Sequence, residues 1–347
     1  MENKPTDIPF LSNIGLMLTY KCSVACPHCI VEAGPHRKEI MSIENSFKWS
    51  LEASVYRSRH IKGLALTGGE PFFDMENLKI ISEHGRKLGF VISAVTNAFW
   101  ASTKERALEV LLQVPAIQMI SLSTDVYHLK SIPFDNIKNG IWAAKQLRIL
   151  YNIAVCTDSE EDTQYKRIIE DILKITDNDN IRTAITFPVG RAEKHIKRFN
   201  YRVSSEPTIA ACTMAGSPVI FPEGKVMGCI GPVMKLSSSH PLVLGSLHNE
   251  SLSEILDRAE SNTILHAIRV WGPHIIVSIL QDHGLGDLIP KEYIADCTCD
   301  ICYKLFTNDK VLDFLRAFSE DKEFKQKIAF ARMYYLSESR MAELLSL

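Results

Sequence analysis

The feature that most constrains the fold is an alternation of short apolar runs and longer amphipathic stretches between Ile14 and about Ala192. Six apolar runs read as strands: Ile14–Tyr20, Gly63–Leu66, Val91–Val95, Ile117–Leu122, Ile153–Cys156 and Thr183–Phe187. Helical periodicity lies between them, over Ser46–Arg57, Leu78–Leu88, Lys104–Gln113, Asn136–Arg148 and Gln164–Ile175. Strand–helix units in series predict an α/β fold with a parallel sheet, open or rolled into a partial barrel, whose ligands bind at the carboxyl ends of the strands.

The second half of the chain lacks this regular alternation of strand and helix patterns. Residues 216–231 predict a β-hairpin whose turn is Pro222-Glu-Gly224, and Ser251-Leu-Ser-Glu254 has the pattern of a capped helix start. Residues 311–345 have helical periodicity and predict two helices. We therefore expect an N-terminal segment over 1–11, an α/β domain over 12–205, a smaller domain over 206–310 and terminal helices over 311–347.

Charge and hydropathy exclude several classes of partner. The net charge of −2 gives no basic field for nucleic acid or an anionic membrane. No apolar run approaches the roughly 20 residues that cross a bilayer, and the first ten residues lack the apolar core of a signal peptide. These features predict a cytoplasmic protein with no nucleic-acid and no membrane partner.

Nine cysteines are many for such a chain, and an odd number fits disulfide pairing poorly. Three of them, Cys22, Cys26 and Cys29, follow the first predicted strand with the spacing C-x3-C-x2-C. Three thiolates on one loop can hold three irons of a cubane and leave the fourth open to a ligand with an amine and a carboxylate. Zinc is the alternative, with His28 or His36 as the fourth ligand.

The sequence Leu66-Thr-Gly68-Gly69-Glu70-Pro71 ends the second predicted strand. With this segment and the cysteine spacing, the chain resembles the radical S-adenosylmethionine (SAM) superfamily. The resemblance implies a partial (β/α)6 barrel and a [4Fe-4S] cluster on the three cysteines, with His28 at the usually aromatic position. It also implies that Gly68, Gly69, Glu70 and Pro71 bind the SAM amino group, since glycines permit close approach and carbonyls or Glu70 can accept from an ammonium.

Later strand ends supply further candidates by the same resemblance. Asn97, Ser121, Ser123 and Val189 lie where family members contact SAM, although loop capping is an equally plain role for Asn97 and Ser121. Asp125 and His128 follow the fourth predicted strand, where they could face the substrate, and we take Asp125 as a catalytic candidate. An ordinary hydrogen-bonded loop histidine is the alternative for His128.

A second set of thiols lies in the C-terminal half. Cys212 and Cys229 flank the predicted hairpin, which would bring the two to a common end, and Cys297-Thr-Cys299-Asp-Ile-Cys302 supplies three more. The spacing around Gly224 resembles the SPASM and twitch extensions of one radical SAM branch. The resemblance implies the shorter twitch form, with an auxiliary [4Fe-4S] cluster on Cys212, Cys229, Cys299 and Cys302, and Cys297 as the alternate to Cys299. A zinc ribbon would use the same thiols.

Cys156 lies in an apolar strand, where a buried cysteine behaves as a small hydrophobe. The alternative for Cys156 or Cys297 is a catalytic role, donating a hydrogen atom to a substrate radical. The resemblance implies that a flavodoxin- or ferredoxin-type reductant supplies an electron, and that SAM is cleaved to a 5′-deoxyadenosyl radical that abstracts hydrogen from the substrate.

Three functions remain open at this point. The first is a maturase that cross-links, epimerises or dehydrogenates a ribosomally made peptide, and the second is a dehydrogenase or epimerase of small molecules in natural-product or sugar metabolism. The third is a non-catalytic iron–sulfur or zinc protein, against which the SAM-ammonium motif argues. Only about ten residues precede the first predicted strand, which leaves no room for an N-terminal leader-binding domain, and the peptide remains our preferred substrate by a small margin.

Overall fold

The structure is a computed structural model that describes residues 10–57, 59–231, 234, 240 and 242–341. It contains two compact units. The α/β unit comprises Asn13–Arg202 with Ile220–Gly224, and the C-terminal unit comprises Met1–Ser12, Val203–Val219 and Lys225–Leu347. Of the predicted N-terminal segment only residues 10 and 11 are described, and residues 342–345 of the last predicted helical stretch also lie outside the described part.

The α/β unit is built on parallel strands in the order β1-β2-β3-β4-β5-β6. Their bounds are β1 Asn13–Met17, β2 Gly63–Thr67, β3 Val91–Thr96, β4 Met119–Ser123, β5 Leu150–Thr157 and β6 Ile181–Ile185. Alternate side chains face opposite sides of the sheet. Leu64 and Ile92 lie against the glycine of a covering helix at Gly85, and Leu122 lies against Gly140 of another.

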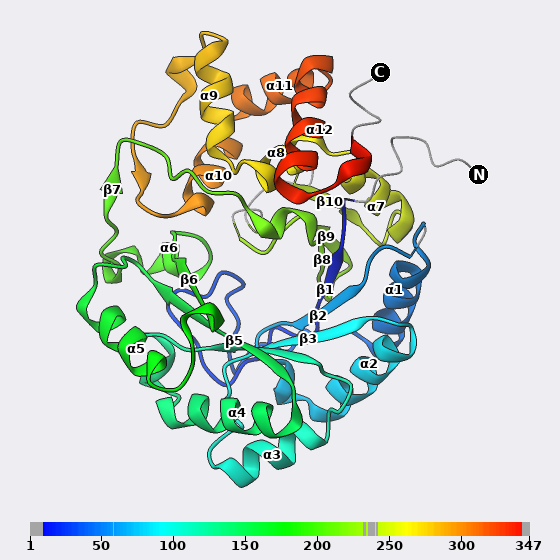
Figure 1. Cartoon of the computed structure of the whole chain (residues 1–347), viewed down its shortest axis with the longest axis vertical. Helices are drawn as coiled ribbons and strands as arrows, with labels where there is room; N and C mark the ends of the chain where they lie inside the picture. The colour runs from blue at the N-terminus through cyan, green and yellow to red at the C-terminus, as the bar shows by residue number, and fades with distance from the viewer. Residues whose placement is uncertain (1–9, 58, 232–233, 235–239, 241, 342–347) are drawn as a thin grey trace. The chain divides into compact units, whose positions relative to one another are not determined.

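Helices connect these strands and follow one another around the outer side of the sheet (Figure 1). They are α1 Ile43–Val55, α2 Met75–Lys87, α3 Lys104–Leu112, α4 Phe134–Leu147, α5 Thr163–Leu173 and the short α6 Arg191–Lys194. Four begin at a side chain that accepts a backbone N–H of the first turn, and these caps are Ser42, Asp74, Thr103 and Asp162. The predicted α/β fold is confirmed, with every predicted strand and helix of this unit within three residues of its observed bounds.

The C-terminal unit contains short strands and a helical layer. Strand β7 (Val203–Ser204) pairs antiparallel with β11 (Tyr293–Ile294), and β9 (Lys225–Met227) pairs antiparallel with β10 (Val243–Ser246). Strands β8 (Val219–Ile220) and β9 flank the predicted turn, where Gly224 has a φ of 75°. The helices are α7 Leu252–Glu260, α8 Thr263–Val270, α9 His274–Asp282, α10 Thr298–Phe306, α11 Asp309–Phe318 and α12 Lys322–Leu336.

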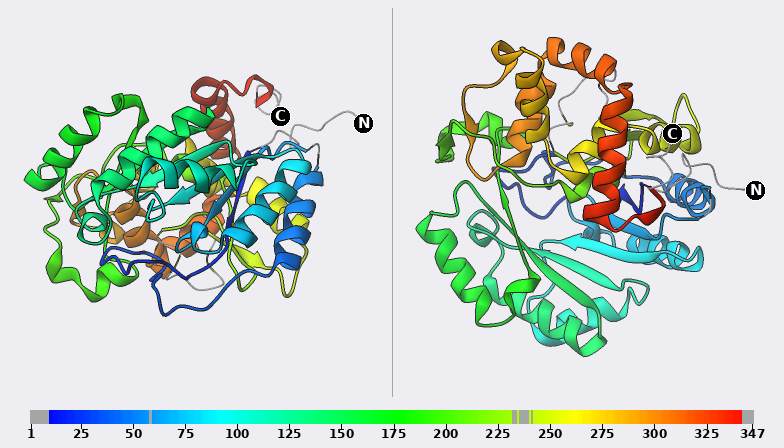
Figure 2. Two further views of the ribbon diagram at one scale, coloured as in Figure 1. Left: turned by 90° about the horizontal axis from the view of Figure 1, so that it is seen from below. Right: turned by 45° about the horizontal axis from the view of Figure 1, so that its top comes forward.

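Helices α8, α9 and α12 lie side by side around a small core of Ala267, Ile279, Phe324 and Ile328 (Figure 2). The predicted capped start at Ser251 is confirmed, because Ser251 and Glu254 form a reciprocal capping box at α7. The two predicted terminal helices are α11 and α12. Helix α9 lies where the sequence analysis assigned no element, and its apolar residues face the core of this unit.

Among the described residues, no single helix is long and apolar enough to cross a membrane. Helices α8 and α9 satisfy the length and composition test only when they are taken together, and they are bent by 113° at the break between them.

Candidate active site and metal centres

The three cysteines of the first motif line one cavity in the α/β unit. The loop that carries them follows β1, and the ends of β2, β3 and β4 supply the other walls. The lining residues are Cys22, Val24, Cys26, His28, Cys29, Ala33, Gly69, Val95, Thr96, Asn97, Ser123 and His128. Of the candidates from the sequence, the cysteine motif, His28, Gly69, Asn97, Ser123 and His128 line this one cavity, together with Thr96.

Two of the three sulfur atoms have a hydrogen-bonding neighbour. Asn97 Nδ2 lies 3.5 Å from Cys22 Sγ, and the backbone N–H of Ala33 donates to Cys29 Sγ over 3.3 Å, while Cys26 lines the cavity together with His128. Burial raises the pKa of the Cys22 thiol to about 12 and also raises that of Cys29. Burial therefore makes the free thiolate form of these cysteines unfavourable. A metal cation that replaces the proton stabilises the thiolate, so such thiols suit a metal site. The donor set therefore fits a thiolate-bound cluster.

Backbone contacts fix the cysteine loop to the loop after β2. Gly69 N–H donates to Thr19 O over 2.6 Å, and Glu70 N–H donates to Lys21 O over 2.9 Å. A Cβ at Gly69 would lie 2.2 Å from Lys21 O, and one at Gly68 would lie 2.5 Å from Thr19 O. The two glycines therefore permit the approach of this loop to the cysteine loop, where the sequence analysis expected approach to a ligand.

Glu70 is fully buried and accepts hydrogen bonds within the protein. Its Oε1 accepts from Thr96 Oγ1 over 2.8 Å and from Phe72 N–H over 3.1 Å, and its Oε2 accepts from Asn97 N–H over 2.8 Å. Burial raises the pKa of this carboxyl to about 7. The carboxyl fastens the end of β3 to the Gly69 loop, and Gly69 rather than Glu70 lines the cavity. Contact between Glu70 and a SAM ammonium remains a prediction.

The segment after β6 fixes the other side of the cysteine loop. Arg191 Nη1 donates to Cys26 O over 2.7 Å, Nη2 donates to Ala33 O over 2.6 Å, and the Arg191 N–H donates to Cys29 O over 3.0 Å. Gly190 has a φ of 65°, and a Cβ there would lie 2.2 Å from Ile30 O. The sequence analysis did not single out Arg191. Its only signal is a basic residue directly after a glycine at a strand end.

Asp125 and His128 form a buried pair beside the cavity. Asp125 is 1% exposed, and its Oδ2 lies 2.9 Å from His128 Nδ1. Burial alone would lower the pKa of His128, but the Asp125 carboxylate holds it well above the usual value. The His28 and Tyr127 rings lie tilted at 37° with their centroids 4.6 Å apart, and His28 Nε2 is 3.9 Å from Asp125 Oδ2. Because Asp125 does not line the cavity, any catalytic role of this residue would act through His128.

The remaining candidates of the α/β unit lie at different depths. Ser121 Oγ donates to Asn152 Oδ1 over 2.7 Å on the face of the sheet away from the helices, and it does not line the cavity. Val189 is fully buried, and Pro71 is buried at the start of a short 3-10 helix. Cys156 lies on β5, where burial, Asp125 and the first-motif cysteines Cys26 and Cys29 raise the pKa of its thiol. Cys156 therefore lies close enough to Asp125, Cys26 and Cys29 for their charges to affect its thiol.

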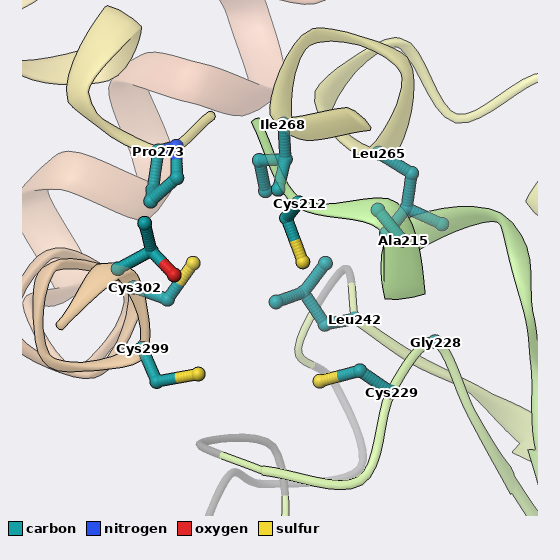
Figure 3. A pocket seen from close by; sticks show the side chains of 11 residues that line it. Cys212, Ala215, Gly228, Cys229, Leu242, Leu265, Ile268, Pro273, Cys299 and Cys302 are labelled. Atoms are coloured by element: carbon teal, nitrogen blue, oxygen red, sulfur yellow. The ribbon is translucent and has the colours of Figure 1, made fainter. Parts of the chain in front are cut away.

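The second set of thiols lines a cavity of its own in the C-terminal unit. Figure 3 shows the sulfur atoms of Cys212, Cys229, Cys299 and Cys302 turned toward a common space. Cys212 precedes β8, Cys229 follows β9, and the other two lie on α10. The other lining residues are Ala215, Gly228, Leu242, Leu265, Ile268, Pro273 and Thr298. The hairpin and helix α10 therefore bring together the four predicted ligands.

Cys297 does not line this cavity and is 3% exposed, at the residue before α10. Burial raises the pKa of the Cys212, Cys299 and Cys302 thiols, and for Cys302 the other three cavity cysteines add to the rise. Four thiols in an otherwise apolar cavity fit a tetrathiolate centre. The geometry favours Cys299 over Cys297 as a ligand.

Comparisons with known proteins agree with these motifs. A family model of the radical SAM superfamily matches residues 16–128. The putative peptide biosynthesis protein YydG of Bacillus subtilis (strain 168) is 22% identical over 317 residues, which cover 88% of this chain and 96% of YydG. GTP 3′,8-cyclase of Listeria welshimeri serovar 6b is 29% identical over 196 residues, 52% of this chain and 55% of the enzyme, so the similarity spans about half of each.

The crystal structure of Streptococcus suis SuiB bound to S-adenosylmethionine has the same fold, with a TM-score of 0.50 and 13% identity, over 71% of this chain and 65% of SuiB. The family match spans the cysteine loop, the Gly69 loop and the Asp125–His128 pair, all of which meet at one edge of the partial barrel. Residues 16–128 of the chain thus carry a radical SAM domain, and the cofactors of that superfamily are SAM and a [4Fe-4S] cluster.

Proposed function

We propose that this radical SAM enzyme modifies a ribosomally made peptide, by cross-linking, epimerisation or dehydrogenation. The observation that carries the proposal is the similarity to YydG, a putative peptide biosynthesis protein, over nearly the whole of both chains. The similarity to GTP 3′,8-cyclase covers only about half of each chain.

The residues around the cavity of the first cysteine motif have different proposed roles. Cys22, Cys26 and Cys29 would hold the cluster, and the backbone of Gly69 and the side chain of Ser123 offer polar atoms to SAM in the same cavity. When bound, the cluster and SAM supply hydrogen-atom abstraction from an unactivated C–H bond. Arg191 and Glu70 keep the loops around the cavity in place.

The side chains on the face of the sheet away from the helices favour a substrate without charged groups. Its side chains on β2 to β5 include Thr67, Ser93, Ser121, Asn152 and Cys156. Among the described residues of these four strands, none of either face is charged. Phosphate groups are usually bound by arginine, lysine or helix N-termini. Hydroxyl and amide groups suit the N–H and C=O groups of a peptide backbone better than a phosphorylated metabolite.

We propose further that Cys212, Cys229, Cys299 and Cys302 hold an auxiliary [4Fe-4S] cluster of the twitch type. Their convergence on one apolar cavity supports this ligand set. The presence of a radical SAM site in the same chain favours iron and sulfide over zinc. Such a cluster would accept the second electron in a cross-link or a dehydrogenation, whereas epimerisation needs a hydrogen donor instead.

Cys156 is the better candidate for a hydrogen donor of the two cysteines outside the ligand sets. It lies on the sheet face that carries the polar side chains, and its thiol is held in the protonated form, which a hydrogen donor requires. Cys297 is buried in the C-terminal unit, beside the second set of thiols.

Anaerobic reconstitution tests the cofactor assignment. Wild-type protein should bind about eight irons and eight sulfides per chain, and a Cys22/Cys26/Cys29 triple-Ala variant about four, with loss of deoxyadenosine formation from SAM. Cys156→Ala is the matched control and should keep the iron count. Zinc at the second site would contradict the auxiliary cluster, and SAM cleavage that survives in the triple variant would contradict the whole assignment.

The peptide assignment is tested by searching the genes beside this one for a short precursor peptide and supplying that peptide to the enzyme. Reduced enzyme, SAM and the peptide are incubated in deuterated water, and the product is sequenced by mass spectrometry. A loss of two hydrogens identifies a cross-link or dehydrogenation, and a gain of one deuterium at an α-carbon identifies epimerisation. An unmodified peptide with enzyme that cleaves SAM and converts a small molecule would support the small-molecule alternative instead.

A further inference from the structure

Helices α9 and α12 of the C-terminal unit form the walls of an open groove, which we call the α9–α12 groove. Its volume is about 720 Å³. It lies over the small hydrophobic core that the two helices share. A cavity of this size with an apolar lining is typical of a binding site, whereas voids left by packing are much smaller. Its apolar lining side chains include Trp271, Ile275, Ile279, Phe318, Phe324 and Phe330.

Helix α12 contributes one long face to this groove. Its lining residues run from Glu323 to Tyr335 and recur at helical spacing. At 1.5 Å per residue this face is about 18 Å long, which matches about three turns of a second helix. Phe330 is 54% exposed and Tyr335 is 62% exposed. Exposed apolar side chains gathered along one groove mark an interaction site, and an amphipathic peptide is a common occupant of such a groove.

The charged side chains along the groove are mostly acidic. Asp282, Asp321 and Glu323 are the carboxylates of the described lining, and Lys327 is its one ammonium. Lys327 Nζ pairs with Glu323 Oε1 over 2.7 Å, and Asp321 and Asp282 add to the rise that Glu323 causes in the pKa of Lys327. Negative charge is therefore in excess, and the faces of aromatic rings also attract cations. Both features suit a ligand that carries lysine or arginine beside apolar groups.

The Asp282 carboxylate does not stabilise its own helix. Asp282 is the last residue of α9, where a negative charge opposes the helix dipole. Asp321, by contrast, caps α12 by accepting the Phe324 N–H over 2.7 Å, and Glu323 is paired with Lys327. Among the described residues, no hydrogen bond or ion pair engages the side chain of Asp282, which is exposed. This carboxylate is therefore available to a partner.

We propose that the α9–α12 groove binds a basic, amphipathic segment of the precursor peptide, outside the residues that are modified. The inference rests on the proposed peptide substrate. The hydroxyl and amide groups on the sheet face suit a peptide backbone but distinguish little between sequences. Binding energy from a part of the substrate that does not react supplies the missing selectivity. The apolar side of the segment would lie on the aromatic rings, and its cations would face Asp282 and the neighbouring carboxylates.

The charges favour this occupant over two others. A second copy of the chain, docked by the same face, would bring the excess carboxylates of two grooves together, and like charges repel. A small apolar ligand would draw nothing from the carboxylates at all. The experiment below distinguishes these occupants by the dependence of binding on charge and by the oligomeric state.

The probe is a fluorescently labelled helical peptide of leucine and lysine, about 15 residues long, with leucine at every third or fourth position. Its binding to reconstituted full-length protein is measured by fluorescence anisotropy at low and high salt. The same peptide with glutamate in place of lysine is the control for charge. Iron is counted in every protein sample, so that variants are compared at equal loading.

Two groove variants are each matched by a control. Asp282→Lys reverses the exposed carboxylate at the end of α9, and Glu170→Lys reverses an exposed carboxylate on α5. Phe330→Ala removes an exposed ring of the groove, and Tyr334→Ala removes a ring of α12 that is 71% exposed and lies outside the lining.

Asp282→Lys and Phe330→Ala should each weaken binding of the leucine–lysine peptide about tenfold, and both control variants should match wild type. The glutamate peptide should bind at least about tenfold more weakly, and high salt should weaken the wild-type complex. Equal affinity of wild type and Asp282→Lys would overturn the inference, as would equally tight binding of the glutamate peptide. A wild-type dimer that Asp282→Lys dissociates in sedimentation would overturn it in favour of a second copy.

The precursor peptide is then tested with the same variants. Its KM should rise about tenfold in Asp282→Lys and in Phe330→Ala, with a much smaller change in kcat, because the groove contributes binding and no reacting group. The unmodified precursor should also displace the leucine–lysine probe. If wild type modifies the precursor and Asp282→Lys has the same KM, the inference fails and the proposed function stands. If wild type modifies no peptide, the proposed function fails, and displacement of the probe by the precursor decides the inference separately.

Discussion

The guanidinium of Arg191 donates to the carbonyl oxygen of Cys26 over 2.7 Å and so joins the segment after β6 to the cysteine loop after β1. The two residues are 165 positions apart in the sequence. The second guanidinium nitrogen donates to Ala33 O over 2.6 Å, which makes Arg191 a clamp across the loop. Two charge-assisted bonds from one rigid group fix both ends of the segment that carries Cys26 and Cys29.

Replacement of this clamp gives a first prediction. Arg191→Gln should lower the free energy of unfolding of the iron-free protein by about 2–3 kcal/mol, because two partly buried carbonyls lose a charged donor. It should also lower the iron retained at the first site. Urea unfolding and iron counts after desalting measure the two effects. Lys194→Gln is the control, since Lys194 pairs with Glu32 while 64% exposed, and should cost less than about 1 kcal/mol. Equal effects of both changes would refute the clamp.

Glu70 gives a second prediction, which separates support of the loops from contact with SAM. Glu70→Ala should destabilise the iron-free protein by about 3 kcal/mol, since it leaves the donors of Thr96, Phe72 and Asn97 without their acceptor. Glu76→Ala, on the exposed side of α2, should change stability by less than about 0.5 kcal/mol. Chemical denaturation of both variants measures this, and a neutral Glu70→Ala would show that the buried carboxyl does not hold the end of β3.

The second thiol set gives a third prediction, made in the Cys22/Cys26/Cys29 triple-Ala background so that only one site is counted. Cys302→Ala should remove most of the remaining iron, because its sulfur points into the common space (Figure 3). Cys297→Ala should retain it, since Cys297 lies outside the cavity lining. Iron and sulfide assays measure both. Loss of iron in Cys297→Ala with retention in Cys299→Ala would assign the ligand to Cys297.

His266 gives a fourth prediction, on pH dependence. Its ring stacks on Phe10 at a centroid distance of 4.0 Å, and its nitrogens lie 2.9 Å from Glu260 O and 3.3 Å from Arg332 Nη1. Burial and Arg332 lower the pKa of His266 to about 3. Between about pH 6.5 and 3 the unfolded chain therefore binds a proton that the folded chain does not, so stability is complete above about pH 6.5 and is lost as the pH falls.

The expected size is about 2 kcal/mol between pH 7 and pH 5, from 1.36 kcal/mol per pH unit below the unfolded pKa. It is measured as the difference in free energy of unfolding between wild type and His266→Phe, which should shrink by that amount over this range. His248→Phe, at an exposed histidine, is the control, and its profile should run parallel to that of wild type. A constant difference for His266→Phe would show that folding does not lower the pKa of this ring.

Much of the α/β unit could be predicted from the sequence because its order is local. Apolar runs such as Gly63–Leu66 and helical periodicity such as that of Leu78–Leu88 depend on neighbours in the chain, and the elements predicted from them fall within three residues of their observed ends. The grouping of Cys22, Cys26 and Cys29 on one loop, and of Cys212 and Cys229 at one end of a hairpin, was also accessible, since it follows from thiol spacing and a glycine turn. Helix α9 was missed because His274–Asp282 is short and apolar around most of its circumference, so it shows little periodicity.

The supporting contacts could not be predicted, because they join residues distant in sequence. Glu70 carries a signal for a ligand contact, yet its three acceptor bonds depend on where the end of β3 lies. The sequence alone does not distinguish Arg191 from an ordinary surface arginine. Its bonds form only when the segment after β6 lies beside the loop after β1. The Asp125–His128 pair is local, but His128 lines one cavity with Cys26 only when the ends of β1 and β4 come together. A single sequence does not show which residues that are far apart in the chain come into contact.

The contacts of Gly69, Glu70 and Arg191 with the main chain of the cysteine loop join protein to protein and use none of the three sulfur atoms. A loop already held in shape loses little conformational entropy when a cluster enters it. A cubane assembled elsewhere and handed over by a carrier would thus meet a ready-made receptor. After oxygen has destroyed the cluster, the same receptor would remain, and the enzyme could be repaired by refilling rather than by refolding or replacement.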